Sequence, residues 1–305
     1  MGRRRLMTAV AILLLAAMAA YIVARRGELG YLQRLSINVL LATLACQLLA
    51  HLMWNQAMLV PLRQHVRLGY WELFAVRSGG LLASYVVPVA GNVGVRLAYL
   101  RRRGLRYPDF VWATTVSSVL GLLAAAMLGM LALGALWAVA GPPPPLVAGL
   151  AAAVLTLGLA GVASLRWLPA FAGHPRFRSQ RWVAVVSRHE MTLRVVAQVL
   201  AASIGRHLFS FISFGLLYQE LAGGRTQFLT GGLVYAITSP MRIVMVTPGN
   251  LGIIEWIVGA VGTLLAFDLT TGLVVALVFR AMSLAGQGVG LLMGAALVGV
   301  RGSAA

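Results

Sequence analysis

Helix breakers and a carboxylate meet in the segment Thr247-Pro248-Gly249-Asn250-Leu251-Gly252-Ile253-Ile254-Glu255-Trp256, which is otherwise apolar. An earlier segment, Pro88-Val89-Ala90-Gly91-Asn92-Val93-Gly94-Val95-Arg96, repeats its Gly-Asn-x-Gly-aliphatic core. Each copy follows a Gly-Gly pair, Gly79-Gly80 in the first case and Gly231-Gly232 in the second. Paired helix-breaking segments in the two halves of a membrane protein are typical of a transporter binding site. The two segments therefore predict the site around which the chain is organised.

The composition indicates a membrane protein. Of the 305 residues, 60% are hydrophobic and only 10% are charged, which excludes an ordinary soluble domain. The formal net charge is +18, and all 25 basic residues are Arg. They cluster between apolar runs, where they would meet anionic headgroups and set the topology, so nucleic-acid binding is not expected. The single cysteine, Cys46, excludes an intrachain disulfide and a thiolate metal site.

Apolar runs long enough to cross a membrane recur along the chain. They are predicted at residues 6–24, 36–60, 111–140, 146–167, 193–219, 253–267 and 273–300. The first run follows Arg3 to Arg5 like a signal peptide, but it is too long for a signal core and is predicted to be an anchor helix. The predicted fold class is an all-α polytopic membrane protein with about 7–8 transmembrane helices.

Basic tracts set the predicted topology. Residues 96–106 and 166–194 are rich in Arg, whereas the turn Gly141 to Pro145 between them carries no charge. The positive-inside rule puts both basic tracts in the cytoplasm and the proline turn outside. The protein is therefore expected to be a multi-pass protein of the cytoplasmic (inner) membrane.

The two broken segments, residues 73–95 and 228–252, contain apolar stretches that are too short to span. We expect them to be re-entrant, because irregular backbone at membrane depth must be buried in protein or line a cavity. Three spans separate them, so the second should enter from the opposite face, which predicts inverted repeats. One domain, residues 1–305, would contain a first half at about 36–140 and a second at about 193–300, joined by 146–192. The structural breakers are Pro88, Gly91, Gly94, Pro240, Pro248, Gly249 and Gly252.

Charged residues at membrane depth are the candidate site. At this depth the sequence has three arginines, Arg206, Arg242 and Arg280, but only one acid, Glu255. The surplus of positive charge favours an anionic guest, and guanidinium groups bind phosphate bidentately. Half-helices that start after Gly-Asn could aim their amides at the same phosphate, with the Asn side chains as caps. The predicted substrate-binding residues are Arg96, Arg206, Arg242, Arg280, Glu255, Asn92 and Asn250.

Structural interpretations of these residues stay open at the level of sequence. Arg206 and Arg280 could instead extend to the membrane interface or bond to backbone carbonyls. In the second span, His51 and Asn55 lie one helical turn apart on one face, and the simplest reading is two polar groups bonded to a neighbouring helix.

Signatures of catalysis are missing from the sequence. No two of the seven acids have the spacing of a metal site or of a general acid/base pair. A P-loop, a Gly-x-Ser-x-Gly elbow and an HExxH motif are also absent. We therefore expect no enzyme activity, no catalytic residues, no metal and no cofactor.

The segments around residues 88–104 and 247–255, with Arg280, resemble the lysylphosphatidylglycerol synthase transmembrane region family. The resemblance runs from about residue 35 to residue 300. It implies a bundle of two pseudo-symmetric halves that binds a lipid-linked anionic substrate or moves it across the cytoplasmic membrane. Residues that match the family's motifs are Gly94 and Arg96 in the first, and Pro248, Gly249, Gly252, Glu255 and Arg280 in the second.

Two departures from the family's pattern fall in the first half. Val95 stands where an acid is expected, and Ser117-Ser118 stand at or near the place of a Glu-Arg pair. The first half is therefore expected to differ in its contact with the substrate. The chain also has no soluble synthase domain, so aminoacyl transfer to lipid is not expected from it alone.

Two functions compete at this stage. The leading hypothesis is a flippase for an anionic phospholipid or a polyprenyl-phosphate-linked lipid, with Glu255 as a counter-charge or a proton-coupled switch. The alternative is a non-transporting accessory subunit that presents a lipid-linked substrate to a partner glycosyltransferase or lipid synthase. An intramembrane enzyme acting on lipid phosphates is disfavoured by the missing catalytic groups.

Overall fold

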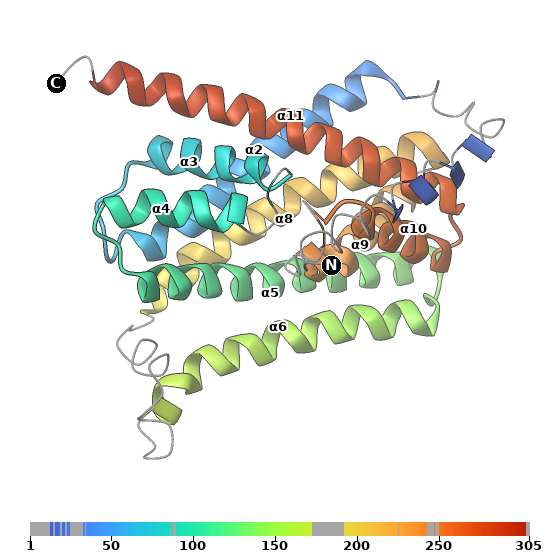
Figure 1. Cartoon of the computed structure of the whole chain (residues 1–305). Helices are drawn as coiled ribbons and strands as arrows, with labels where there is room; N and C mark the ends of the chain where they lie inside the picture. The colour runs from blue at the N-terminus through green and yellow to red at the C-terminus, as the bar shows by residue number, and fades with distance from the viewer. Residues whose placement is uncertain are drawn as a thin grey trace.

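The computed structural model describes residues 35–85, 87, 90–172, 192–224, 226–242, 247 and 250–302, together with scattered positions between 13 and 33. Every regular element within these residues is a helix (Figure 1). The all-α prediction is therefore confirmed over the described part of the chain.

Within the described residues, five helices are long and apolar enough to cross a membrane. They are α2 (Ile37–Leu62), α5 (Tyr107–Ala140), α6 (Pro145–Ala172), α8 (Leu193–Ala222) and α11 (Leu269–Gly302). Their starts follow from the sequence: the Ser36 hydroxyl accepts from the amide of Val39 at the start of α2, and the Thr192 hydroxyl accepts from Val195 at the start of α8. The predicted spans at these five places are confirmed as membrane-length helices.

The predicted span at 253–267 is shorter than expected. The helix there, α10 (Ile253–Leu264), has 12 residues, which corresponds to a length of about 18 Å against a hydrocarbon core of about 30 Å. Its C-cap is Leu265, and Ala266 follows in a left-handed conformation with φ of 62°. The prediction of a full span was therefore wrong here. The run at 6–24 lies largely outside the described residues, so the total of 7–8 spans stays a prediction.

Both broken segments fold as pairs of short helices. In the first, α3 (Tyr70–Ala83) packs against a π-helical turn, η2 (Ala90–Gly94), and against α4 (Val95–Arg102). In the second, α9 (Thr226–Thr238) leads through the 3-10 turn η3 (Ser239–Arg242) to α10, which packs back on α9. Figure 1 shows the first pair toward one end of the bundle and the second pair toward the other. Between the two pairs the chain runs through α5, α6 and α8.

The glycines of the broken segments permit close packing and sharp turns. A Cβ at Gly91 would lie 2.5 Å from the backbone of Ala83 and Ser84, so only glycine lets η2 approach the end of α3. Gly252 has φ of +82° and is the N-cap of α10. Gly94 is the N-cap of α4, and Pro240 lies in η3. Three predicted breakers, Pro88, Pro248 and Gly249, lie outside the described residues.

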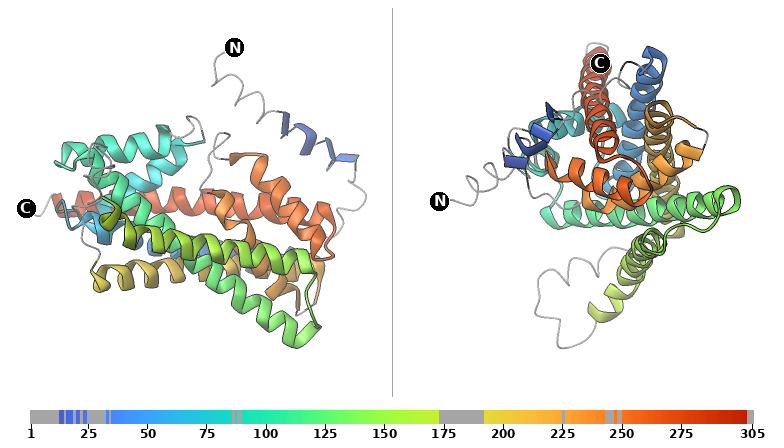
Figure 2. Two further views of the ribbon diagram at one scale, coloured as in Figure 1. Left: turned by 90° about the horizontal axis from the view of Figure 1, so that it is seen from below. Right: turned by 90° about the vertical axis from the view of Figure 1, so that its right-hand side faces the viewer.

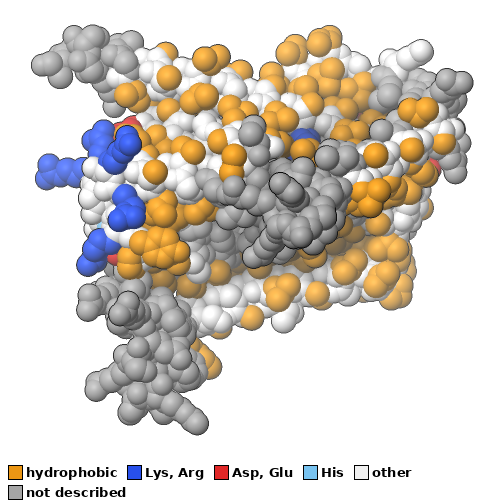
Figure 3. All heavy atoms as spheres, viewed as in Figure 1, with side chains coloured by type: hydrophobic (Ala, Val, Ile, Leu, Met, Phe, Trp, Pro, Cys, Tyr) orange, Lys and Arg blue, Asp and Glu red, His pale blue; other side chains and the backbone are white. Residues whose placement is uncertain are grey.

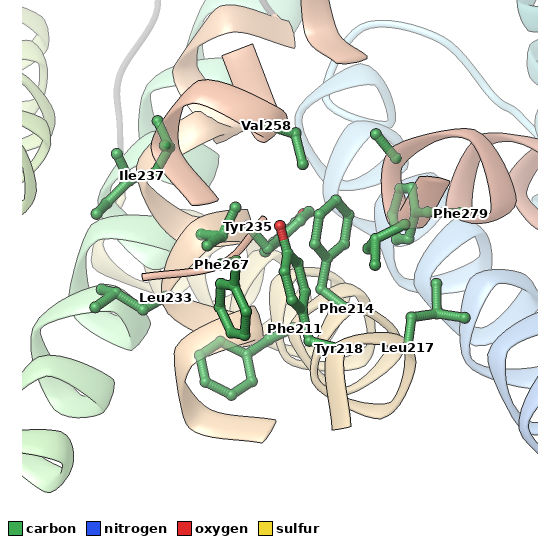
Figure 4. Close-up of a cluster of buried hydrophobic side chains, with 14 of the residues drawn as sticks. Phe211, Phe214, Leu217, Tyr218, Leu233, Tyr235, Ile237, Val258, Phe267 and Phe279 are labelled. Atoms are coloured by element: carbon green, nitrogen blue, oxygen red, sulfur yellow. The ribbon is translucent and has the colours of Figure 1, made fainter. Parts of the chain in front are cut away.

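Aromatic side chains dominate the core between α8, α9, α10 and α11 (Figure 4). The ring centroids of Phe214 and Phe279 are 4.4 Å apart, as are those of Tyr218 and Phe267. Gly232 of α9 allows this packing, because a Cβ there would come within 2.1 Å of the Phe211 ring. The second half of the chain is thus held together by a tightly packed cluster next to its broken segment.

The surface differs between the sides and one end of the bundle. α6 lies at the periphery, beside α5 (Figure 2). Apolar side chains are spread over the sides, whereas arginines gather at the end that carries α4 (Figure 3). There Arg103 pairs with Glu72, and its hydrogen bond to Tyr99 together with the Glu72 charge raises the pKa of the Arg103 guanidinium above its usual value. Further exposed arginines at this end include Arg63, Arg67, Arg101, Arg102 and Arg106.

Candidate functional site

A cavity of about 560 Å³ lies in the middle of the bundle. Side chains from α2, α5, α8 and α11 line it, together with residues from both broken segments. The first segment contributes Ser84, Tyr85, Asn92 and Arg96, and the second contributes Tyr235, Ser239, Asn250 and Glu255. Residues of the two segments therefore line the same cavity.

Arg280 of α11 links the two segments at this site. Its Nε pairs with Oε1 of Glu255, and its Nη2 donates to the backbone carbonyl of Asn250 over 3.2 Å. The guanidinium carbon lies 5.9 Å from the centre of the Tyr85 ring at the end of α3. Both charged side chains are largely withdrawn from the surface, at 12% exposure for Arg280 and 1% for Glu255. This ion pair joins α10 to α11 in the cavity wall.

Glu255 also caps its own helix. Its Oε2 accepts from the amide of Gly252 over 2.8 Å, which is half of a capping box at the start of α10. The expectation that Asn250 caps this helix was wrong. Asn250 instead has φ of 54° and donates its side-chain amide to the carbonyl of Met241, so it stabilises the turn that precedes α10.

The first segment has a different arrangement at its break. Asn92 does not cap α4, whose N-cap is Gly94 without a side-chain hydrogen bond. Its side chain is buried and lines the cavity, and its Oδ1 has no hydrogen-bond partner among the described residues. Arg96 is 4% exposed and donates from Nε to the carbonyl of Asn92 over 3.0 Å. Val95, at the position of the expected acid, is exposed at 40% and lies outside the cavity lining.

Helix α8 brings a cation and a histidine to the opposite wall. Arg206 lines the cavity, and His207 shares a 2.8 Å hydrogen bond through Nδ1 with the hydroxyl of Tyr235. The side chains of Arg206 and His207 both approach α5 at Gly121, which has no side chain. A Cβ at Gly121 would lie 3.9 Å from Nη1 of Arg206 and 3.5 Å from Nε2 of His207. Arg206 therefore faces the interior rather than the membrane interface.

One face of α2 supplies site residues that the sequence analysis did not select. Gln47, His51, Trp54 and Met58 all line the cavity. Their spacing of four, three and four residues is that of a single helix face, and this pattern of polar and aromatic side chains in an apolar span was the available signal. Nε2 of His51 lies 3.3 Å from both the carbonyl and the hydroxyl oxygen of Ser283.

Asn55, which was considered together with His51, has a structural role. Its side-chain amide donates to the carbonyl of Tyr70 over 3.0 Å, and the Tyr70 hydroxyl donates to the carbonyl of Leu52 over 2.8 Å. The start of α3 is thereby tied to α2. The structural interpretation thus holds for Asn55 and also for His51, which bonds to Ser283 of α11 and in addition lines the cavity.

Arg242 and the serine pair Ser117-Ser118 were also singled out from the sequence. Arg242 ends η3, and its side chain lies outside what the structure describes. Ser117 and Ser118 line the cavity from α5, and the Ser117 hydroxyl bonds to the carbonyls of Ala57 and Ala113. Hydroxyl groups thus occupy the wall where a charged pair was expected.

A smaller cavity of about 300 Å³ opens on α5 and shares Thr114, Ser118 and Leu122 with the central one. Its remaining lining residues are Thr115, which is exposed, and Val119, which is half-buried. The central cavity therefore adjoins a side groove on the flank of the bundle.

The described residues contain no group of three or more His, Cys, Asp or Glu side chains placed to hold a metal ion. Comparison with known proteins gives one family. The family model described as "Lysylphosphatidylglycerol synthase TM region" matches residues 3–289, nearly the whole chain, and so confirms the resemblance of the two motifs. No curated protein and no solved structure matches the chain.

Proposed function

Because this chain belongs to the lysylphosphatidylglycerol synthase TM region family, we propose that its central cavity binds the headgroup of an anionic membrane lipid and that the protein moves this lipid between the leaflets. In this proposal the chain lies in the cytoplasmic membrane, with its arginine-rich end in the cytoplasm. The proposal assigns no catalytic step to the chain.

The observation that carries the proposal is the charge of the cavity wall. Three guanidinium groups line it, from Arg96, Arg206 and Arg280, and the one carboxylate among its described lining residues is Glu255. Charges at membrane depth are costly and usually serve function. Guanidinium groups bind phosphate oxygens by charge-assisted hydrogen bonds, which suits the phosphate of a lipid headgroup.

The side groove on α5 favours a lipid over a soluble anion. It shares the lining residues Thr114, Ser118 and Leu122 with the central cavity, and its lining residue Thr115 is exposed on α5. A headgroup in the cavity could therefore leave its hydrocarbon chains in the membrane, with the groove as their path. The hydroxyl groups of Thr114 and Ser118 would lie near the polar end of that path.

The arrangement of the broken segments supports movement as well as binding. The two helix pairs approach from opposite ends of the bundle and both line the cavity (Figure 1). We propose that they are re-entrant and related as inverted repeats, so that the site can be reached from either face in turn. Arg280, which touches both, would change its partners between the two states.

Leaflet exchange in liposomes tests the function. Purified protein is reconstituted with fluorescent phosphatidylglycerol or phosphatidylcholine, and the label that a membrane-impermeant quencher cannot reach is followed over time. We expect the protein to accelerate exchange of the anionic lipid. Arg280→Met should reduce that rate at least about tenfold, because it removes a charge-assisted contact to phosphate.

Two variants make this experiment specific. Glu255→Gln retains a side chain that can cap α10 while it removes the carboxylate charge, so it separates helix capping from ion pairing. Arg102→Met removes an exposed arginine of the basic end and should exchange lipid as the wild type does. If the wild-type protein binds anionic lipid but never exchanges it, the transport proposal is wrong and the accessory-subunit hypothesis replaces it.

A further inference from the structure

The Trp54 ring on α2 lies between two guanidinium groups. The guanidinium carbons of Arg77 and Arg206 are each 3.9 Å from the centre of the ring. Two groups at this distance would overlap on one face, so they occupy opposite faces of the indole. Arg206 lines the cavity, whereas Arg77 lies behind the indole.

Arg77 is a buried cation with unused donors. Its side chain is among the most buried in the chain, at 1% exposure. Nη1 donates to the carbonyl of His51 over 2.9 Å, but Nε and Nη2 have no hydrogen-bond partner among the described residues. A buried charge without a counter-charge is strongly unfavourable, so its retention calls for a compensating anion nearby.

Positive charge accumulates around this tryptophan. Arg206 and Arg96 both act electrostatically on Arg77. The cavity carboxylate, Glu255, is already engaged by Arg280 and by the amide of Gly252. The other described acids bind elsewhere, and their partners are Tyr99 and Arg103 for Glu72, Arg106 for Asp109, the Ser36 amide for Glu220 and the Thr271 amide for Asp268. Among the described residues no carboxylate pairs with Arg77 or Arg96, so a single negative charge in the cavity would leave a positive surplus at these two arginines.

We propose that the lipid bound here ends in a terminal phosphate, either a phosphate monoester or a diphosphate, rather than in a phosphodiester. This inference rests on the proposed function and specifies its substrate class. A phosphate monoester carries roughly 1.5 to 2 negative charges at neutral pH, whereas a diester carries one. The charge of the monoester thus matches the two cations Arg96 and Arg77, with Arg206 as a further donor on the cavity side of Trp54.

The shape of the site agrees with a terminal phosphate. Arg206 lies next to Gly121 of α5, and Ser118, one helical turn earlier, belongs to both the cavity and the side groove. A phosphate held by Arg206 would therefore sit about one turn from the exit path for its hydrocarbon chain. A monoester has a single substituent to pass through that exit, whereas the second substituent of a diester would have to stay among the arginines.

Lipid affinity at two pH values tests this inference. Binding of phosphatidate and of phosphatidylglycerol with identical acyl chains is measured by native mass spectrometry on the purified full chain in detergent. At pH 7.5 we expect phosphatidate to bind about tenfold more tightly, the effect of one additional charge-assisted hydrogen bond. At pH 5.5 phosphatidate loses most of its second charge, because that ionisation has a pKa of about 6, and the preference should shrink toward twofold.

Variants assign the preference to the cluster. Arg77→Met removes a charge that does not line the cavity, so it should abolish most of the pH 7.5 preference without removing a direct contact with the lipid. Arg206→Met, on the cavity side of Trp54, gives the same readout at a second position. Arg102→Met is the control and should keep the preference. An unchanged ratio of the two affinities in Arg77→Met and Arg206→Met would overturn the inference.

The outcomes also separate this inference from the function on which it rests. If both lipids bind with equal, high affinity, the protein is still a lipid binder and the terminal-phosphate inference is wrong. If neither lipid binds, the proposed function itself fails. Competition by glycerol 3-phosphate and inorganic phosphate shows whether the natural ligand is a lipid or a soluble phosphate. Weak competition supports a lipid. Displacement of phosphatidate by either soluble compound at equal concentration would make a soluble phosphate the ligand and overturn the lipid assignment.

Discussion

At the scale of the residue, the site depends on side chains that serve two neighbours at once. Glu255 caps α10 and pairs with Arg280, while Trp54 holds a guanidinium group on each face. The sequence revealed Glu255, because a carboxylate beside Pro and Gly in an apolar segment stands out. Trp54 gave no such signal, since a tryptophan in a membrane span usually packs or anchors. Its role depends on Arg77 and Arg206, which come from two other helices.

Replacement of Trp54 tests its positioning role. Trp54→Leu should lower the affinity for anionic lipid about thirtyfold, because a desolvated cation–π contact is worth roughly 2 kcal/mol. Trp54→Phe keeps an aromatic face and should recover part of the loss. Lipid binding is measured by native mass spectrometry, with Trp137→Leu as the control, since Trp137 is 61% exposed on α5.

If Trp54 only stabilised the fold, Trp54→Leu would change stability but not lipid affinity. In that case Trp54→Leu would lower the thermal unfolding temperature in detergent, and its affinity for phosphatidate would equal that of the wild type at temperatures where both are folded. The positioning role also predicts that Trp54→Leu reduces the preference for phosphatidate over phosphatidylglycerol, because it displaces both arginines. A preference that stays at the wild-type value would contradict it.

At the scale of the element, the short helices depend on backbones in close contact. The Gly and Pro pattern predicted both broken segments, but it did not predict the π-helical turn η2 or the early end of α10. Local sequence marks where a helix is interrupted. How the chain continues depends on its packing partner, and for η2 that partner is the end of α3, which approaches Gly91 at the backbone.

Gly91→Ala tests the contact between η2 and α3. The added Cβ would lie 2.5 Å from backbone atoms of Ala83 and Ser84, which cannot move aside as a side-chain end could. We expect a loss of about 1–3 kcal/mol in the free energy of unfolding. The thermal unfolding temperature in detergent measures the change. Gly149→Ala is the matched control, because nothing lies within 4 Å of its added Cβ on α6.

The control should be neutral or slightly stabilising, since alanine is the better helix former by about 1 kcal/mol. If Gly91→Ala is as stable as Gly149→Ala, the close approach of η2 and α3 is not required for folding. If it is less stable, the remaining folded protein should also bind lipid more weakly, because η2 carries Asn92 in the cavity wall.

At the scale of the whole molecule, the distribution of charge and the order of the helices were readable from sequence, whereas the cavity was not. Hydropathy and length identified the five long helices within a few residues of their observed ends. The central cavity requires contacts between helices far apart in the chain, such as Arg280 of α11 with Asn250 and Tyr85. Sequence periodicity contains no information on which helix faces meet, so the site was indicated only by the breaker segments and by the charged residues at membrane depth.

Accessibility of introduced cysteines tests the orientation of the molecule. In a Cys46→Ser background, Pro144→Cys should react with a membrane-impermeant maleimide on intact cells, because the proline turn is expected outside. Arg102→Cys should react only after the cells are permeabilised. Both positions are exposed, so a difference between them reports the side of the membrane. The reverse labelling pattern would invert the topology and put the arginine-rich end outside.

Arg280 also has a consequence for how the protein is made. α11 follows every other cavity-lining element in the chain, and it supplies the cation that joins Glu255 to the turn at Asn250 and to Tyr85. A nascent chain that has not yet delivered α11 to the membrane carries both helix pairs but lacks the side chain that connects them. The cavity wall is therefore completed only after α11 has been synthesised, and a chain interrupted before α11 would lack the contacts that Arg280 makes with Glu255, Asn250 and Tyr85.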